Sequence, residues 1–478
     1  MTTDVASLRR KLQTHGQDHL LRFAEELSDH ARAGLLRQID ALDLPALERL
    51  IRAYVRAKPA HHAPATIDPV HAYSLDGRRA SATWDRNRFR ALGDQLIREG
   101  KVAAFTVAGG QGSRLGFDGP KGVYQAGAVT RKPLFAFLAE SVAASAKRYN
   151  TRIPWYIMTS PLNHAATVGF FQSHNYLGLE PDDVMFFPQG VLPTFEMASG
   201  RILLASKSEI AVNPDGHGGS LRALRASGAL ADMRKRGVEH ISYTQIDNPL
   251  VRVIAPVFLG LHAHADDSSG EMSSKMVAKA HAREKVGVFC RADNKTQVIE
   301  YSDLPSSLAE AVDPDGRLRF NAGSIAVHIL SRAFVERLTS GDDFALPYHR
   351  AEKKAPHVDL ESGRVVEPST PNAVKLETFV FDAIPLAQSS IVLETERVEE
   401  FAPIKNAEGA DSPASCAAFQ TERAARWLER AGVTVPRRED GSPECVLEIS
   451  PLTALEPDDL RALPSLPRAI EPGAHVVV

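Results

Sequence analysis

Hydrophobic residues near the start of the chain repeat at helical spacing. They are three or four positions apart, with charged residues between them. This spacing places them on one face of an amphipathic helix, so the pattern predicts helices from residue 5 to residue 58. The positions that define the pattern are Leu20, Phe23, Leu27, Leu47, Leu50 and Ile51.

A proline-containing stretch, "KPAHHAPATIDPVHAYS", ends this helical region. Prolines interrupt helices, so we expect a loop here. His61 and His62 are adjacent in this loop and form a candidate metal pair. The alternative interpretation is that both are solvated, as is usual for a loop histidine pair without further ligands.

From about residue 86 onward, short apolar runs alternate with longer helical patterns. The expected helices are 86–98, 132–149 and 163–174, and the expected strands are 101–108, 153–160, 238–247, 256–263 and 285–292. This alternation predicts an α/β fold with a mixed, mostly parallel sheet that carries helices on both faces. Ligands of such sheets bind at the carboxyl ends of the strands.

After about residue 390 the pattern becomes shorter in period and richer in proline. We therefore expect three parts. These are a helical N-terminal region over residues 1–95, an α/β domain over 96–390 and a small C-terminal domain over 391–478.

Composition narrows the class of protein. The 478 residues carry a net charge of -3, so there is no general reason to expect binding to nucleic acid or to an acidic membrane surface. Cys290, Cys416 and Cys445 are far apart and odd in number, which favours neither a disulfide framework nor a zinc site. No apolar run approaches the roughly 20 residues that span a bilayer, and the first residues lack the apolar core of a signal peptide. These features predict a cytoplasmic protein.

The candidate chemistry begins in the stretch "VAAFTVAGGQGSRLGFDGPKGVY", from Val102 to Tyr124. Its glycines would let backbone N–H groups approach a phosphate closely. Arg114 and Lys121 lie in the same loop, and two cations so placed repel each other unless an anion lies between them. The loop therefore predicts an anion site, and the alternative is a tight turn without a ligand.

Two common phosphate motifs do not match this loop. The P-loop pattern fails because Lys121 is followed by Gly122 rather than by Ser or Thr. Gly110, Gly112 and Gly116 have one residue too many for the dinucleotide fingerprint. The arrangement G-G-x-G-[ST]-R-L-G followed by P-K-G instead resembles the signature of the UDP-sugar pyrophosphorylases, which are nucleotidyltransferases.

Further motifs follow in the order of that family, from about Trp84 to the C-terminal domain. They are similar above all to the UDP-N-acetylhexosamine pyrophosphorylase branch, and this resemblance implies a Rossmann-like nucleotidyltransferase domain. The motifs are "FFPQG" with Gln189, "NPDGHGGSLRAL" with Gly216, "IDNPL" with Asp247, "VIEYS" with Glu300, "FNAGS" with Asn321, "ETFVFD" with Phe379 and Phe381, and "FAPIKNA" with Lys405.

The resemblance implies that a sugar 1-phosphate oxygen attacks the alpha phosphorus of UTP, giving a UDP-sugar and pyrophosphate. Arg114 and Lys121 would hold the triphosphate, and Lys405 would hold the sugar phosphate. Asp247 would ligate Mg²⁺, although on its own it could simply cap a turn after a strand. The attacking phosphate is already ionised, so positioning and charge neutralisation would carry the reaction.

The remaining roles implied by the resemblance concern the base and the sugar. The residues assigned to the nucleotide are Gly109, Gly110, Gln189, Gly216 and His217, and Gln189 would select uracil because an amide offers both a donor and an acceptor. The residues assigned to the sugar are Glu300, Asn321, Phe379 and Phe381. By default, Phe379 and Phe381 would count as core residues.

One position departs from the acetylhexosamine branch. His217 stands where that branch usually has asparagine, and the G-H-G order is similar to the UDP-glucose pyrophosphorylases. The motifs "FNAGS", "EYS" and "FVFD" nevertheless follow the acetylhexosamine pattern. We therefore expect N-acetylglucosamine 1-phosphate as the substrate, with glucose 1-phosphate as the alternative. An alternative of a different class is a regulatory protein that binds a UDP-sugar without turnover. A monomer or a homodimer is expected.

Overall fold

The computed structural model describes residues 5–58, 66–79, 82–341 and 346–478. Contacts divide the chain into two compact units. The first unit comprises Met1–Ala63, Gly190–Ser220 and Leu346–Val380, and the second comprises Pro64–Gln189, Leu221–Ala345 and Phe381–Val478. The candidate metal pair His61 and His62 lies outside the described residues.

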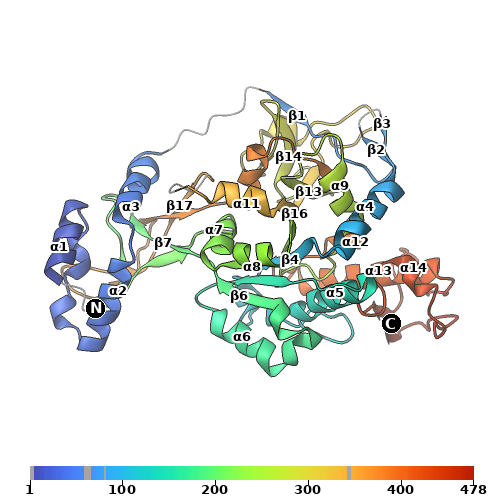
Figure 1. Ribbon diagram of the computed structural model, residues 1–478, viewed down its shortest axis with the longest axis horizontal. Coiled ribbons are helices and arrows are strands. Elements are labelled where there is room, and N and C mark those ends of the chain that lie inside the picture. Colours follow the sequence, from blue (N-terminus) through green and yellow to red (C-terminus); the bar gives the residue numbers. More distant parts are fainter. Residues whose placement is uncertain (1–4, 59–65, 80–81, 342–345) are drawn as a thin grey trace. The chain divides into compact units, whose positions relative to one another are not determined.

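A ten-stranded sheet is the centre of the second unit (Figure 1). Its parallel part has the order β12-β4-β5-β6, with β12 (His240–Gln245), β4 (Val102–Val107), β5 (Trp155–Thr159) and β6 (Val184–Pro188). In register, Val107 lies opposite both Gln245 and Met158. β12, β4 and β5 therefore end at one edge of the sheet, and the residues that follow these strands are brought together there.

Further strands, most of them antiparallel to their neighbours, extend the sheet beyond β12. β16 (Ala322–Ser331) pairs antiparallel with β12, and the remaining strands lie beyond it. They are β1 (Ile67–Pro69), β13 (Met272–Ala278), β14 (Val288–Ala292), β15 (Lys295–Ile299) and β21 (Val392–Glu394). The mixed sheet with a parallel central part agrees with the sequence prediction.

The helices expected at 86–98, 132–149 and 163–174 are confirmed as α4 (Arg86–Arg98), α5 (Leu134–Tyr149) and α6 (His164–Ser173). The strand expected at 256–263 is wrong, because this segment forms α9 (Pro256–His264). Its residues are apolar almost throughout, so periodicity cannot separate a buried helix from a strand.

Helices α4 and α9 pack closely side by side (Figure 1). A Cβ added at Gly260 would lie 1.8 Å from the carbonyl oxygen of Phe89, and one added at Gly93 would lie 1.8 Å from that of Pro256. Only glycine allows the two backbones to approach this closely. Most residues of α9 are buried, which is why its sequence lacks the alternation of an amphipathic helix.

The first unit combines the N-terminal helices with strands from two later segments. The helices are α1 (Val5–Thr14), α2 (Asp29–Asp40) and α3 (Leu44–Leu50), and the strands include β7 (Val191–Pro193), β8 (Phe195–Glu196), β11 (Val212–Pro214), β17 (His349–Lys353) and β20 (Ala373–Glu377). One hydrophobic cluster joins them, with Leu12, Leu35 and Ile39 packed in the same core as Phe195 and Val374.

This two-unit division differs from the three ranges expected from the sequence, because strands from distant segments share a core with the N-terminal helices. The domain ranges 1–95, 96–390 and 391–478 stay a prediction. Residues after Ser412 form α13 (Pro413–Arg430), β22 (Val446–Glu448), α14 (Pro457–Leu460) and β23 (His475–Val477), with a hydrophobic cluster of their own.

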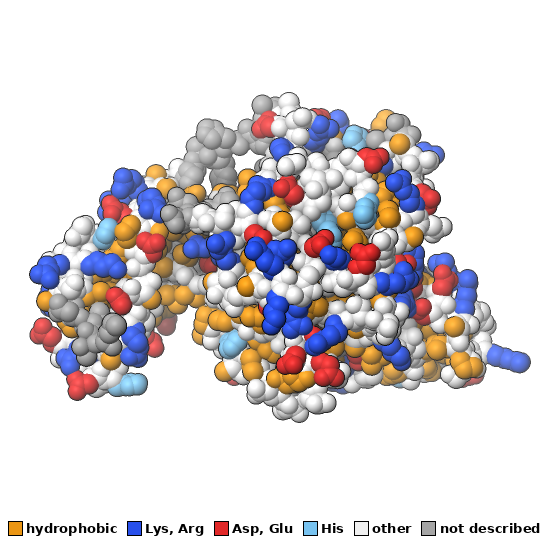
Figure 2. Space-filling model, viewed as in Figure 1, with side chains coloured by type: hydrophobic (Ala, Val, Ile, Leu, Met, Phe, Trp, Pro, Cys, Tyr) orange, Lys and Arg blue, Asp and Glu red, His pale blue; other side chains and the backbone are white. Residues whose placement is uncertain are grey.

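The remaining helices and strands are short. They are β2 (Arg78–Arg79), β3 (Ala82–Thr83), β9 (Leu204–Ser206), β10 (Glu209–Ile210), α7 (Gly219–Ala226), α8 (Ala229–Lys235), α10 (Ser306–Ala309), α11 (Arg332–Leu338), β18 (His357–Val358), β19 (Val365–Val366) and α12 (Arg397–Glu400). Among the described helices, none has the length and apolar character needed to cross a membrane. Basic and acidic side chains are mixed over the visible face (Figure 2).

Candidate functional site

The glycine-rich loop begins where β4 ends, at the edge of the sheet where ligands of α/β proteins bind. Ala108 still donates its N–H to Met158, at 2.7 Å. In the described part of the chain, the next three N–H groups, those of Gly109, Gly110 and Gln111, have no hydrogen-bond acceptor. Consecutive free N–H groups are the usual backbone arrangement for binding an anion. The geometry therefore supports the anion site predicted from the sequence.

Gln189 lies directly against this loop, at the end of β6. A Cβ added at Gly109 would lie only 2.3 Å from the Gln189 side-chain oxygen Oε1, so a larger residue there would displace the Gln189 amide. Gln189 is buried, and its backbone N–H donates to the Thr159 carbonyl at 2.8 Å. The structure thus brings together two residues that the sequence assigned separately to the nucleotide.

The two basic residues of the loop have different surroundings. Lys121 begins a short 3-10 helix (Lys121–Val123), and its backbone N–H donates to Gly110 at 3.0 Å. Its ammonium Nζ lies 3.6 Å from Oδ2 of Asp247, with both side chains largely buried. Arg114 is exposed, on the 3-10 helix Ser113–Leu115, and makes no hydrogen bond or ion pair within the residues described. Lys121 is therefore held in place, whereas Arg114 extends from the same loop into solvent.

Asp247 and Lys405 are brought together by the chain segments around them. Asp247 follows β12, and its backbone carbonyl accepts the N–H of Ile404 at 2.9 Å. Asn248 ties the same two segments, since its amide donates to the Glu400 carbonyl at 2.6 Å and accepts the Ala402 N–H at 3.1 Å. Asp247, Asn248 and Lys405 line one cavity of about 60 Å³. Sequence reasoning missed Asn248, although it stands inside the quoted "IDNPL" motif.

Asp411 is a second carboxylate in this region that the sequence did not reveal. Its carbonyl accepts the Lys405 N–H at 2.6 Å. Burial raises the pKa of Asp411, Lys405 opposes that shift, and the nearby charge of Asp247 adds to it. Nothing in the surrounding letters, "GADSPAS", marks this residue, because its role depends on the fold around Lys405.

The described residues contain no cluster of three or more His, Cys, Asp or Glu side chains that could hold a metal ion. Mg²⁺ at phosphate-transfer sites needs only one or two carboxylates, because substrate phosphates and waters complete its octahedron. The Asp247 carboxylate lies 3.6 Å from the ammonium of Lys121, which belongs to the loop with the free N–H groups. This carboxylate is therefore suited to such a shared site.

Three predicted residues lie in the first unit and form a group of their own. Gly216 has φ +84, and a Cβ there would lie 2.3 Å from the Thr378 carbonyl oxygen, so the "GHGG" turn requires glycine. The His217 ring stacks on Phe379, with 5.2 Å between ring centres. His349, which sequence reasoning missed, packs against the same Phe379 ring at 4.3 Å. A nucleotide candidate and a sugar candidate are thus in direct contact.

His217 is held in its neutral form. The Val380 N–H donates to Nδ1 of His217 at 3.1 Å, which requires that nitrogen to be unprotonated. Burial, with a smaller contribution from the neighbouring His349, lowers the pKa of His217 to about 4. At neutral pH its proton therefore resides on Nε2.

The sugar candidates of the second unit lie near the ends of three neighbouring strands. Asn321 precedes β16, and its carbonyl accepts the Lys279 N–H at 2.8 Å. Glu300 follows β15, and its Oε1 lies 3.5 Å from the position a Cβ on Gly287 would take. Gly287 in turn accepts the N–H of Ser324, on the strand that Asn321 precedes, at 2.8 Å. Phe381 lies in the 3-10 helix Val380–Leu386. Their roles stay predictions.

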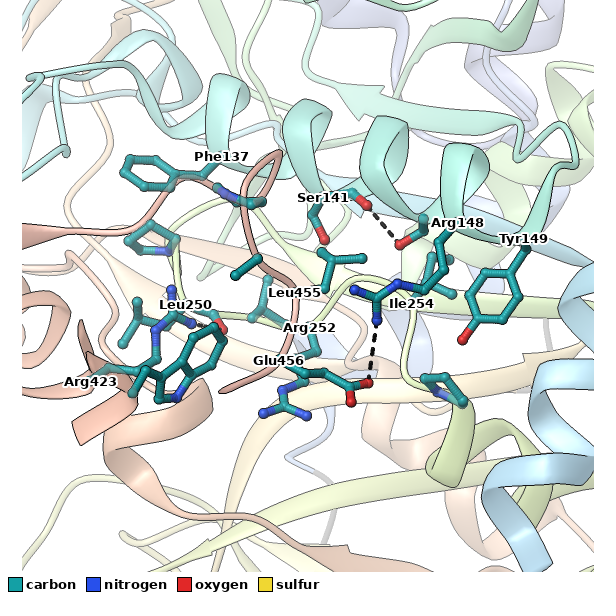
Figure 3. Close-up of a pocket in the computed structure, with 17 residues that line it drawn as sticks. Phe137, Ser141, Arg148, Tyr149, Leu250, Arg252, Ile254, Arg423, Leu455 and Glu456 are labelled. Atoms are coloured by element: carbon teal, nitrogen blue, oxygen red, sulfur yellow. Dashed lines mark hydrogen bonds and ion pairs between the residues drawn. The ribbon is translucent and has the colours of Figure 1, made fainter. Parts of the chain in front are cut away.

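A second cavity, of about 40 Å³, lies between α5, α13 and the segments 249–256 and 451–456 (Figure 3). Arg148 forms an ion pair with Glu456 at 3.7 Å across it, and Arg423 donates to the Leu250 carbonyl at 3.3 Å. Burial lowers the pKa of Arg423 to about 10. The cavity contains none of the predicted site residues, and its charged groups already have protein partners.

Comparison with known proteins agrees with this geometry. The family model described as UTP–glucose-1-phosphate uridylyltransferase matches residues 65–421. The chain is 37% identical over 480 residues to UDP-N-acetylhexosamine pyrophosphorylase-like protein 1 of Homo sapiens, covering 95% of this chain and 93% of that protein. It is 38% identical over 357 residues to the UDP-N-acetylglucosamine pyrophosphorylase of Saccharomyces cerevisiae, covering 73% of this chain and 74% of that protein.

Among solved structures, the fold is similar to that of the uridine diphosphate N-acetylglucosamine pyrophosphorylase of Trypanosoma brucei in complex with an inhibitor. The TM-score is 0.80 at 27% identity, and the match covers 100% of this chain and 99% of the other. The expected α/β nucleotidyltransferase fold is confirmed. The chain therefore belongs to the UTP–glucose-1-phosphate uridylyltransferase family of UDP-sugar pyrophosphorylases.

Proposed function

We propose that this protein is a uridylyltransferase that forms UDP-N-acetylglucosamine and pyrophosphate from UTP and N-acetylglucosamine 1-phosphate. The observation that carries the proposal is the run of free N–H groups at Gly109, Gly110 and Gln111, beside Gln189 and next to the Lys121–Asp247 pair. The names of the relatives in man and yeast support the choice of reaction and of sugar.

In this reaction an oxygen of the sugar phosphate forms a bond to the alpha phosphorus of UTP. The bond from that phosphorus to the bridging oxygen breaks, and pyrophosphate leaves with the electron pair. The nucleophile is already an anion, so no side chain has to remove a proton from it. The protein contributes by holding the sugar phosphate, the alpha phosphate and the departing pyrophosphate in line and by neutralising their mutual repulsion.

Charge neutralisation falls to the basic residues of the second unit. We assign Lys121 and Arg114 to the triphosphate and the departing pyrophosphate, because both belong to the loop with the free N–H groups. We assign Lys405 to the sugar phosphate, since it lines the cavity beside Asp247. Asp247 would hold Mg²⁺, which when bound draws negative charge from the phosphate oxygens.

Base and sugar selection are assigned to separate groups. Gln189 would read the donor and acceptor edge of uracil, which lies close to the backbone because Gly109 has no side chain. An acetamido group carries an amide and a methyl, so a selective pocket needs a polar partner and an apolar wall. We assign the polar partner to Asn321 and the wall to Phe379 or Phe381, with Glu300 binding sugar hydroxyls. Gly216 and His217 are assigned to the nucleotide.

Glucose 1-phosphate is the second candidate substrate, because the description of the family model names it and the "GHG" order contains His217. The test supplies UTP, Mg²⁺ and both sugar phosphates at equal concentration and measures the two UDP-sugars formed. We expect UDP-N-acetylglucosamine to predominate, and Asn321→Ala to reduce its formation more than that of UDP-glucose. Predominant UDP-glucose would replace the sugar assignment, and absence of both products would contradict the reaction itself.

The setting of the enzyme follows from simpler features. Cys290, Cys416 and Cys445 are all buried free thiols, as suits a reducing compartment, so we propose a cytoplasmic enzyme. UTP and a sugar 1-phosphate are its proposed partners, and the assembly is proposed to be a monomer or a homodimer.

A further inference from the structure

Asn163 stands at the position that caps the N-terminus of α6, yet its side chain does not cap that helix. Asparagine is favoured at this position because its side-chain oxygen normally accepts an N–H of the first helical turn. Here Oδ1 accepts the N–H of Ser160 instead, at 2.8 Å. The side chain is buried, with 1% exposure. The chain thus forgoes a stabilising cap in favour of other contacts.

Those other contacts are with the glycine-rich loop. The amide nitrogen Nδ2 of Asn163 donates to the carbonyl of Ala108 at 3.1 Å and to that of Gly110 at 3.2 Å. Both carbonyls are therefore turned toward one side chain. Lys121 donates its N–H to the Gly110 carbonyl as well, so this oxygen is fixed from two sides.

The direction of these carbonyls decides where the neighbouring N–H groups point. In a trans peptide the C=O of one residue and the N–H of the next are antiparallel, and the described chain has no cis peptide bond. When Asn163 holds the carbonyls of Ala108 and Gly110, the N–H groups of Gly109 and Gln111 point away from it. These are two of the three N–H groups without a protein acceptor.

We propose that Asn163 is a positioning residue that aims the N–H groups of Gly109 and Gln111 at the bound nucleotide. The inference rests on the proposed function, because it takes this loop as the nucleotide site. Asn163 touches no reacting group itself. It acts by preorganising the donors, so that they need not reorient when UTP binds.

The first test replaces Asn163 with alanine and measures kinetics together with UTP binding. Binding is read as the rise in Tm on adding UTP and Mg²⁺. For Asn163→Ala we expect KM for UTP to rise and kcat/KM for UTP to fall by about tenfold to a hundredfold, as for a small misplacement of binding groups. The KM for the sugar phosphate should remain near the wild-type value.

The second test uses Asn163→Asp, which keeps the shape but has no donor when ionised. A buried carboxyl between two carbonyls has a raised pKa, and when protonated it can donate one hydrogen bond. We therefore expect its kcat/KM for UTP, relative to wild type, to rise as the pH is lowered from about 8 to about 6. A purely structural defect would not recover in this direction.

Asn372→Asp is the matched control. The Asn372 amide likewise holds the backbone: it donates to the carbonyl of Ala355 at 3.1 Å and accepts the N–H of Ala355 at 2.8 Å, and it also contacts Nδ1 of His357 at 3.2 Å. It should change neither KM for UTP nor the pH profile. The proposal is overturned if Asn163→Ala binds UTP like wild type, or if kcat/KM for UTP of Asn163→Asp relative to wild type is constant with pH. It is also overturned if Asn372→Asp loses kcat/KM for UTP to the same extent. Wild-type protein whose Tm rises with UTP but which forms no UDP-sugar would overturn the proposed function alone, since the binding test still applies to Asn163.

Discussion

At the scale of single residues, the site depends on charges that the fold places next to each other. Lys121 and Asp247 are more than a hundred positions apart in sequence, yet their side chains are 3.6 Å apart and largely shielded from solvent. Lys121→Met removes the charge and retains most of the apolar stem. We expect kcat to fall at least about a hundredfold, which corresponds to losing roughly 3 kcal/mol of electrostatic stabilisation of the transition state.

The control for this variant is Lys207→Met, which breaks the exposed ion pair of Lys207 with Glu26 in the first unit. Exposed pairs contribute little, so activity and Tm should both remain near wild type. Steady-state pyrophosphate release, with circular dichroism to check folding, makes the comparison. Folded Lys121→Met with normal kcat would mean that the loop binds something other than the reacting phosphates.

At the scale of elements, the crossing of α4 and α9 depends on glycine. A Cβ at Gly260 would meet the Phe89 carbonyl oxygen at 1.8 Å, so Gly260→Ala must force the helices apart. We expect a loss of at least about 1–3 kcal/mol of stability, seen as a lower Tm. Gly169 is also inside a helix, α6, but a Cβ there has no neighbour within 4 Å. Gly169→Ala should therefore leave Tm unchanged or raise it, because alanine is the better helix former. Equal effects of the two substitutions would contradict the packing argument.

At the scale of the whole molecule, buried neutral histidines link stability to pH. Burial lowers the pKa of His240 to about 4 and that of His262 well below its usual value, and the two rings lie 5.2 Å apart. In the unfolded chain both would titrate near about pH 6.5. The free energy of unfolding is therefore at its full value above that pH. It falls as the pH is lowered toward 4, because only the unfolded state takes up the protons.

We expect Tm to decline steadily from pH 7 to pH 5, with a slope in free energy of up to about 1.4 kcal/mol per pH unit for each such histidine. Differential scanning calorimetry across this range measures it. His240→Phe, which removes one titrating ring, should flatten the decline. A Tm that is independent of pH below 7 would contradict the assignment of both rings as neutral.

The sequence by itself determined the features that depend on neighbouring residues. The alternation of strands and helices predicted β4, β5, α5 and α6 close to their observed bounds, because local periodicity reflects which faces are buried. The glycine loop with Lys121 predicted an anion site, since backbone access and charge are properties of a short segment. The family resemblance identified the nucleotide and sugar candidates.

Only the tertiary structure decided what depends on distant segments. The segment Pro256–His264 is a helix that packs against α4 through a glycine contact, and its nearly continuous apolar run does not separate a buried helix from a strand. The first unit draws its core from three separate stretches of chain. Asn163 and Asn248 are common polar residues in sequence, and only folding brings their amides to the carbonyls they hold. Hydrogen bonds are directional and short in range, so such partners can be recognised only once the backbone has placed them.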